Sequence, residues 1–166
     1  MVTKKYATIG LVIIAAVAVF LIFFVDWEAR AVKKHLRSIA KEMTWTPADS
    51  ELTMASRIKH VQEKIAENCQ VELPTYELSI TVSRKDVPAY MMMAKNHFKT
   101  ISVELKDLEV QSIQLPQARA AATAYVKATD ASGQRDDRVL PLEFSLQKVE
   151  KKWQINEVQE IKVLER

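Results

Sequence analysis

The chain has 166 residues, of which 27% are charged, and its formal net charge is only +3. Because lysine and arginine alternate with aspartate and glutamate along the whole chain, the composition argues against a nucleic-acid-binding protein, whose basic residues cluster on one face. Two glycines, Gly10 and Gly133, are too few for the glycine-rich loops that bind nucleotide phosphates. The single cysteine, Cys69, excludes an internal disulfide and is expected to be a small buried side chain.

The first predicted element is a membrane-spanning helix at residues 6–25, a run without a charged side chain. As a helix this run is about 30 Å long, which matches the hydrocarbon core of a bilayer. Tyr6 and Trp27 stand at its ends, as aromatic residues do at membrane interfaces. We therefore expect residues 1–25 to be a transmembrane anchor in contact with the lipid bilayer, and residues 26–166 to be one domain.

Two features of this anchor have competing interpretations. A cleaved signal peptide also starts with basic residues, but its apolar stretch is normally about 7 to 15 residues, so an uncleaved signal-anchor is favoured. A short tail followed by a whole domain is typical of a single-pass protein of the bacterial inner membrane with its domain on the periplasmic side. Counting the basic residues that flank the run favours the opposite orientation.

Two amphipathic helices are expected after the apolar run. Apolar residues recur every three or four positions over residues 26–43, before the break at Pro47. The second helix has Asp49 or Ser50 as its N-cap, and its apolar stripe runs to Ala66. The polar residues of this second helix lie on its other side.

The β-structure begins with the alternating segment YELSITVS at residues 76–83. A short helix is expected at residues 87–97, with Pro88 in its first turn, where the missing N–H is harmless. Four longer segments with period-2 stretches follow, at residues 100–114, 117–129, 138–150 and 152–164. Helices followed by a meander of antiparallel strands predict an α+β domain.

Two irregularities are expected within this meander. Residues 130–134, which include Gly133, have the composition of a turn between the second and third of the long strands. In the last strand, the apolar alternation slips in phase between Ile155 and Val158, which predicts a bulge.

Three segments together indicate a known architecture: the paired N-terminal helices, the strand YELSITVS with the helix start RKDVPAY, and the terminal stretch WQINEVQEIKVL. Their order, over residues 26–164, resembles the nuclear transport factor 2-like superfamily, also called cystatin-like α+β cones. The resemblance implies a curved sheet around a long helix, with a conical pocket. Some members are isomerases or dehydratases, and others are adaptors that dimerise through the sheet. A membrane-anchored member that assembles type IV secretion systems has a similar layout.

An isomerase-type site needs a carboxylate base and hydrogen-bond donors that meet in an apolar pocket. The weak catalytic candidates are Glu143, Tyr125 and His97. In the predicted strands, Glu143 and Tyr125 lie opposite the main apolar faces. Ordinary roles on the sheet surface are therefore favoured for both.

The candidates for lining a ligand pocket are Trp45, Tyr90, Met92 and Met93. Methionine is unbranched and fills irregular space, but three consecutive methionines cannot share one helix face, so at least one is expected to be exposed. The lone His35 on an apolar stripe is expected to be a partly buried histidine with its hydrogen bonds satisfied. No metal site and no cofactor are expected.

The sequence thus favours a membrane-anchored, non-enzymatic binding or scaffold domain of the bacterial cell envelope. Such a domain would use a conical pocket or a sheet face for a small apolar ligand or a protein partner, and a homodimer through the sheet is a further expectation. Two alternatives stay open: a small enzyme of the isomerase or dehydratase type with an acid–base site in the cone, and an assembly subunit of a secretion complex.

Overall fold

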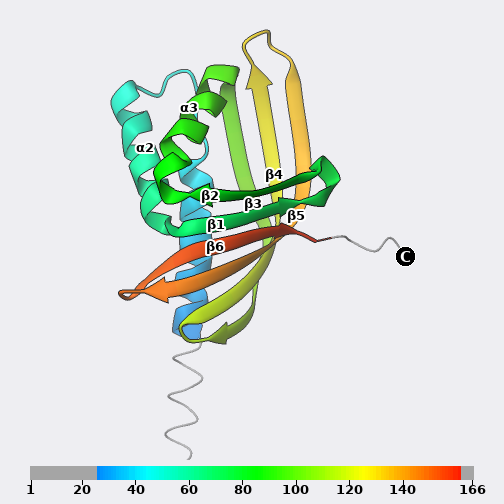
Figure 1. The fold of residues 1–166 in the computed structure, drawn as a ribbon. Coiled ribbons are helices and arrows are strands. Elements are labelled where there is room, and N and C mark those ends of the chain that lie inside the picture. Colours follow the sequence, from blue (N-terminus) through cyan, green and yellow to red (C-terminus); the bar gives the residue numbers. More distant parts are fainter. Residues whose placement is uncertain (1–25, 162–166) are drawn as a thin grey trace, which may run out of the picture.

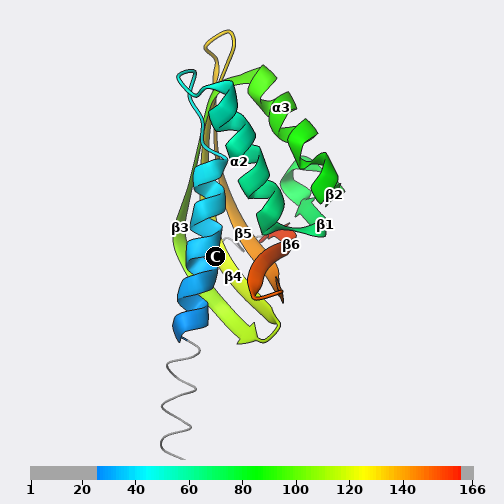
Figure 2. The ribbon, with the colours of Figure 1, turned by 90° about the vertical axis from the view of Figure 1, so that its left-hand side faces the viewer.

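Long strands form a sheet that curves around the helices covering one of its faces (Figure 1, Figure 2). This computed structural model describes residues 26–161. Within that range, no helix is both long and apolar enough to cross a membrane. The span expected at residues 6–25 lies outside the described residues.

Three α-helices are described. The N-terminal helix covers residues 26–42, and it lies beside the long strands in both ribbon views. The next two helices are α2 (Glu51–Lys64) and α3 (Val87–His97). The bounds of α3 and the place of Pro88 at its start confirm the prediction from the sequence.

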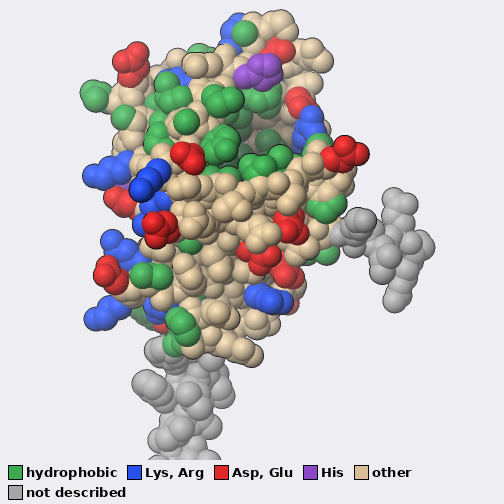
Figure 3. Space-filling view, in the orientation of Figure 1, with side chains coloured by type: hydrophobic (Ala, Val, Ile, Leu, Met, Phe, Trp, Pro, Cys, Tyr) green, Lys and Arg blue, Asp and Glu red, His purple; other side chains and the backbone are tan. Residues whose placement is uncertain are grey.

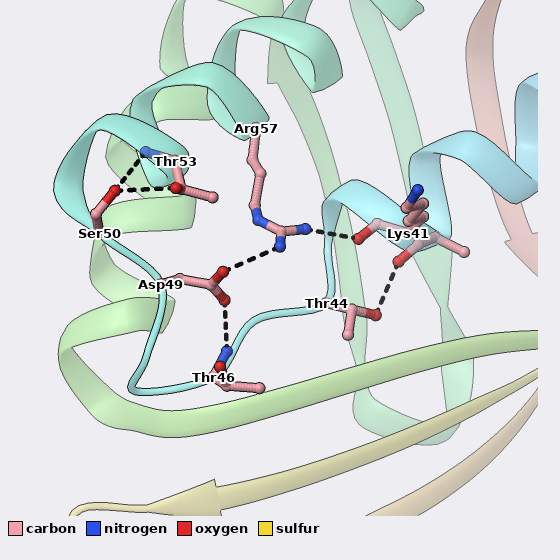
Figure 4. Close-up of polar contacts among 8 residues, drawn as sticks. Lys41, Thr44, Thr46, Asp49, Ser50, Thr53 and Arg57 are labelled. Carbon is pink, nitrogen blue, oxygen red and sulfur yellow. Dashed lines mark hydrogen bonds and ion pairs between the residues drawn. The ribbon is translucent and has the colours of Figure 1, made fainter.

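Side chains fix the loop that joins the N-terminal helix to α2 (Figure 4). The Ser50 hydroxyl accepts a hydrogen bond from the Thr53 N–H at 3.2 Å, so of the two predicted candidates, Asp49 and Ser50, it is Ser50 that caps α2. From α2, the Arg57 guanidinium donates to the Lys41 carbonyl at 3.0 Å and to the Asp49 carboxylate at 3.2 Å. The end of one helix is therefore tied to the side of the next.

The sheet has six strands in the order β2-β1-β6-β5-β4-β3. Neighbouring strands are antiparallel except β1 and β6, which run parallel. Their bounds are β1 (Ile65–Leu73), β2 (Leu78–Ser83), β3 (Phe98–Gln114), β4 (Gln117–Asp130), β5 (Arg135–Val149) and β6 (Lys152–Glu160). The helices and long antiparallel strands confirm the α+β class.

The strand β1 is the element that the sequence did not predict. Its first residues, Ile65 and Ala66, continue the apolar stripe of α2, but the helix ends at Lys64. Ile65 starts a strand because it pairs with Ile155 of β6, which is distant in the sequence. The strand expected at residues 76–83 starts two residues later, since Pro74–Tyr76 form a 3-10 turn.

Both predicted irregularities of the meander are present. The bulge in β6 is at Asn156, where the pairing with β5 shifts by one residue. In the turn between β4 and β5, the Asp130 carboxylate accepts hydrogen bonds from the N–H groups of Ser132 and Gln134, at 2.8 and 2.9 Å. Gly133 has a φ of 90°, which glycine adopts without a steric penalty.

The core is divided into two clusters. In the larger one, the N-terminal helix packs through Val32, Leu36 and Ile39 on the inward faces of the long strands. Small side chains line this face of β4 at alternate positions: Ala118, Ala120, Ala122 and Ala124. The smaller cluster joins α2 and α3 to the loop before α2, through Trp45, Met54, Val61, Val87 and Met91.

Candidate ligand-binding cavity

A cavity of about 420 Å³ lies between the helices and the inner face of the sheet. The N-terminal helix, α3 and five of the strands contribute to its walls, which include Leu36, Trp45, Met91, Ile101, Ala124 and Phe144. Figure 3 shows a hollow lined with hydrophobic side chains in the upper half of the molecule. A volume of this size is within the range of small-molecule sites in proteins.

Helix periodicity and residue size explain why space remains there. Residues 36, 39 and 40 share one face of the N-terminal helix, Met43 directly follows its end, and all four line the cavity. Three of the wall positions, Ala40, Ala94 and Ala124, carry only a methyl group. Because the backbone spacing of helices and sheet is set elsewhere in the core, these short side chains leave a space that larger residues would fill.

The wall is apolar in nearly every residue. Only two of the lining side chains carry an N–H or O–H group, Trp45 and Tyr90. The Trp45 indole N–H already donates to the Phe98 carbonyl at 3.3 Å. The lining contains no carboxylate, histidine, cysteine or basic side chain. Such a wall binds a ligand by removing apolar surface from water.

The structure distributes the four pocket candidates between the wall and the surface. Trp45 and Tyr90 line the cavity, whereas Met92 and Met93 are exposed and do not. The methionine in the wall is Met91, which is buried. Successive helix residues point about 100° apart, so the packing of α3 decides which of the three methionines faces inward, and the sequence does not.

The weak catalytic candidates do not meet in one place. Glu143 and Tyr125 alternate with the inward-facing residues of β5 and β4, and neither lines the cavity. The Lys106 ammonium lies 4.6 Å from the centre of the Tyr125 ring. His97 ends α3 and packs edge-on against Phe98, with 4.6 Å between the ring centres. Nothing in these positions forms an acid–base pair within the cavity.

A buried ion pair lies outside this cavity, and sequence reasoning missed it. Glu28 of the N-terminal helix is buried, with its side chain only 5% exposed. Its carboxylate accepts hydrogen bonds from the Lys148 ammonium and, at 3.0 Å, from the Trp153 indole N–H. These partners are 120 and 125 residues away in the chain, so no local pattern predicts the contact. The pair attaches the N-terminal helix to β5 and β6.

Two further polar groups have structural roles. His35 Nε2 donates to the Lys64 carbonyl at 3.2 Å, as expected for a satisfied, partly buried histidine, and burial lowers its pKa to about 4. Cys69 is buried, and burial together with the charge of Glu157 raises the pKa of its thiol to about 11. Among residues 26–161 there is no group of three His, Cys, Asp or Glu residues that could hold a metal ion.

Comparison with known proteins supports the fold class. No protein-family model and no curated protein matches the sequence. Among solved structures, a provisionally named aromatic ring hydroxylase from Novosphingobium aromaticivorans has a TM-score of 0.64 at 14% identity, over 82% of this chain and 88% of that protein. A provisionally named dehydratase of the NTF2-like family from Streptomyces avermitilis has a TM-score of 0.63 at 12% identity, over 84% of this chain and 99% of that protein.

A third solved structure is an uncharacterised protein with a cystatin-like fold from Caulobacter vibrioides. Its TM-score is 0.57 at 14% identity, over 79% of this chain and 86% of that protein. These identities are low, so the similarity establishes the fold alone. The chain thus has a nuclear transport factor 2-like fold, with helices packed on a curved mixed sheet.

Proposed function

We propose that this protein binds a small apolar ligand in the cavity between its helices and sheet, without converting it chemically. The observation that carries the proposal is the wall itself, which combines about 420 Å³ of space with almost uninterrupted apolar side chains. Apolar cavities take up apolar molecules. The favourable binding free energy comes from the apolar ligand surface that is removed from water, at about 25 cal/mol per Å².

The volume limits the size of the ligand. An apolar cavity of about 150 Å³ holds a benzene molecule, so a cavity of about 420 Å³ has room for two or three rings, or an aliphatic chain of similar volume. A charged group inside the wall is disfavoured, because an unpaired charge in an apolar environment is very costly. The ligand is therefore mainly hydrocarbon.

The enzyme alternative draws on the structural neighbours, since two of them carry provisional names of a hydroxylase and a dehydratase. General acid–base catalysis needs a titratable group within hydrogen-bond reach of the substrate. Tyr90 is the one titratable side chain of the wall. Binding without conversion needs no such group, and we prefer it for that reason.

The remaining parts of the proposal concern location and partners. The uncharged run at residues 6–25 supports a single-pass anchor, which we propose lies in the bacterial inner membrane. The proposed periplasmic side of the domain follows from the layout of a short tail before a whole domain, whereas the count of flanking basic residues favours the other side. Apolar molecules partition into bilayers, so a tethered domain would meet its ligand at a raised local concentration. A homodimer through the sheet, a protein partner and a role in secretion-complex assembly remain predictions.

Filling the cavity tests the proposal. Ala94 lies in the wall on α3, whereas Ala89 is exposed on the same helix, so Ala94→Trp fills the space and Ala89→Trp is the matched control. The full chain in detergent is melted with and without biphenyl. Biphenyl at about ten times its dissociation constant should raise the melting temperature of the wild type and of Ala89→Trp by a few degrees, and leave Ala94→Trp unchanged.

Two results would contradict binding in this cavity. One is a wild-type protein whose melting temperature does not respond to biphenyl. The other is an equal response in Ala94→Trp, which would mean that the probe binds elsewhere. A turnover that Ala94→Trp abolishes would instead support the enzyme alternative.

A further inference from the structure

A second hollow, of about 570 Å³, lies where the N-terminal helix, the end of α2 and the β5–β6 hairpin meet. It shares no lining residue with the apolar cavity. Four lysines from these three elements line it: Lys34, Lys64, Lys151 and Lys152. The one acidic residue of the lining is Glu63, so the lining has an excess of three positive charges. The fold gathers these lysines from three distant parts of the chain.

The positive charge of this hollow is not neutralised by the domain itself. Among residues 26–161, none of the four lysines takes part in an ion pair. The other polar groups of the lining are already bonded, since His35 Nε2 donates to the Lys64 carbonyl at 3.2 Å and the Ser38 hydroxyl donates to the His35 carbonyl at 2.8 Å. The four ammonium groups are therefore available to an anion from outside.

The turn that presents two of these lysines has a strained backbone. Only Glu150 and Lys151 separate β5 from β6, and their φ angles of 49° and 67° lie in the left-handed region. A two-residue turn of this kind favours asparagine and glycine, so a lysine there is less stable than a glycine. The Lys151 side chain is exposed and adds nothing to the core. Strain without a packing benefit is typical of residues with a functional role.

The place of the hollow in the domain indicates where the anion comes from. Asp26, the first described residue of the N-terminal helix, directly follows the uncharged run at residues 6–25. Lys34 is eight residues further along this helix, which is about 12 Å. Both ribbon views place the β5–β6 hairpin in the lower part of the domain, where this helix starts (Figure 1, Figure 2). The lysines thus lie on the side of the domain that a bilayer around residues 6–25 would face.

We propose that this lysine-lined hollow binds the phosphate headgroup of an anionic membrane lipid. The inference rests on the anchor of the proposed function and adds a second contact between the domain and the bilayer. Lysine binds phosphate as a point charge, and basic residues next to a membrane span are attracted to anionic lipids. Such a contact would hold the domain against the bilayer surface.

Two water-soluble short-chain lipids test this role, dihexanoylphosphatidylglycerol, which is anionic, and dihexanoylphosphatidylcholine, which is zwitterionic. Native mass spectrometry of the full chain in detergent gives a dissociation constant for each, and the wild type should prefer the anionic lipid. Lys151→Gly combined with Lys152→Gln should weaken the anionic lipid about tenfold to thirtyfold, because each lysine near an anionic surface contributes about fivefold. Phosphatidylcholine binding should stay unchanged. The melting temperature should not fall, because glycine relieves the strained turn.

The matched control combines Lys59→Gln with Lys127→Gln, which removes two exposed lysines outside the hollow. It should keep the preference of the wild type. Equal weakening in this control would overturn the inference, because the net charge of the protein would then explain the binding. Glycerol phosphate that binds as tightly as the anionic lipid would also overturn it, since the ligand would then be a free phosphate ester.

The anchor is tested separately, so its failure can be told from failure of the hollow. The full chain should float with vesicles of phosphatidylcholine alone. If it floats but the wild type does not prefer the anionic lipid, the inference fails and the anchor stands. If it does not float, the anchor fails and the inference fails with it.

Discussion

The buried ion pair of Glu28 and Lys148 offers the sharpest test of how the N-terminal helix is held. In Lys148→Met, the buried Glu28 carboxylate would keep only the Trp153 N–H as a partner. Removing one partner of a buried pair costs about 3 to 5 kcal/mol. Because the Lys148 side chain is 23% exposed, the site is not fully closed, and we expect about 3 kcal/mol.

The reciprocal change and the double change complete the cycle. Glu28→Leu frees a lysine that can turn toward water but leaves the Trp153 N–H unpaired, which costs about 2 kcal/mol. The double variant Glu28→Leu, Lys148→Met replaces the pair by apolar side chains. It should lose far less than the sum of the two single changes, with a coupling energy of about 3 kcal/mol.

Thermal melting of the full chain in detergent, followed by far-ultraviolet circular dichroism, measures these differences. At about 2 to 4 °C per kcal/mol, Lys148→Met should lower the melting temperature by about 6 to 12 °C. Lys106→Met is the control, because Lys106 pairs with Glu104 at 3.7 Å on the surface and should contribute little. Two results would refute a buried, coupled pair. One is a double variant whose loss of unfolding free energy equals the sum of the two single losses. The other is a loss below about 1 kcal/mol in Lys148→Met.

Three other outcomes follow from single residues. In the folded protein, the pKa of His35 is lowered to about 4. As the pH falls below 6.5, His35 therefore takes up a proton in the unfolded chain before it does so in the folded protein, which favours unfolding. The free energy of unfolding of the wild type should therefore fall by about 2 kcal/mol between pH 7.5 and pH 5. His35→Gln should abolish this fall, as measured by melting at the two pH values. The control His60→Gln, at an exposed site, should retain it. The Cys69 thiol should react with a thiol reagent at pH 8 only when the protein is unfolded, so rapid labelling of native protein would contradict its burial. Ser50→Ala should lower the free energy of unfolding by about 1 kcal/mol through loss of the α2 cap, whereas an unchanged melting temperature would show that the cap contributes nothing.

Local patterns predicted most elements of the fold. The period of the apolar residues located α2, Pro88 marked the start of α3, Asp49 or Ser50 marked the start of α2, and the phase slip marked the bulge at Asn156. These predictions succeeded because each depends on neighbours within a few residues in the chain. The α+β class followed from the order of the elements.

The prediction failed where distant residues decide the outcome. Ile65 and Ala66 fit the stripe of α2 and also fit a strand, and the pairing of β1 with the distant strand β6, which begins at Ile65, makes them β1. Met91, not Met92 or Met93, lines the cavity, because the docking of α3 sets which helix face turns inward.

The sequence by itself determined the class of fold and the approximate bounds of most helices and strands. The tertiary structure alone decided the existence and volume of the cavity and the pairing of Glu28 with Lys148. Periodicity reports which face of an element is apolar, but not how closely two apolar faces approach. That distance depends on side-chain volumes contributed by several elements at once, and it separates a filled core from a binding site.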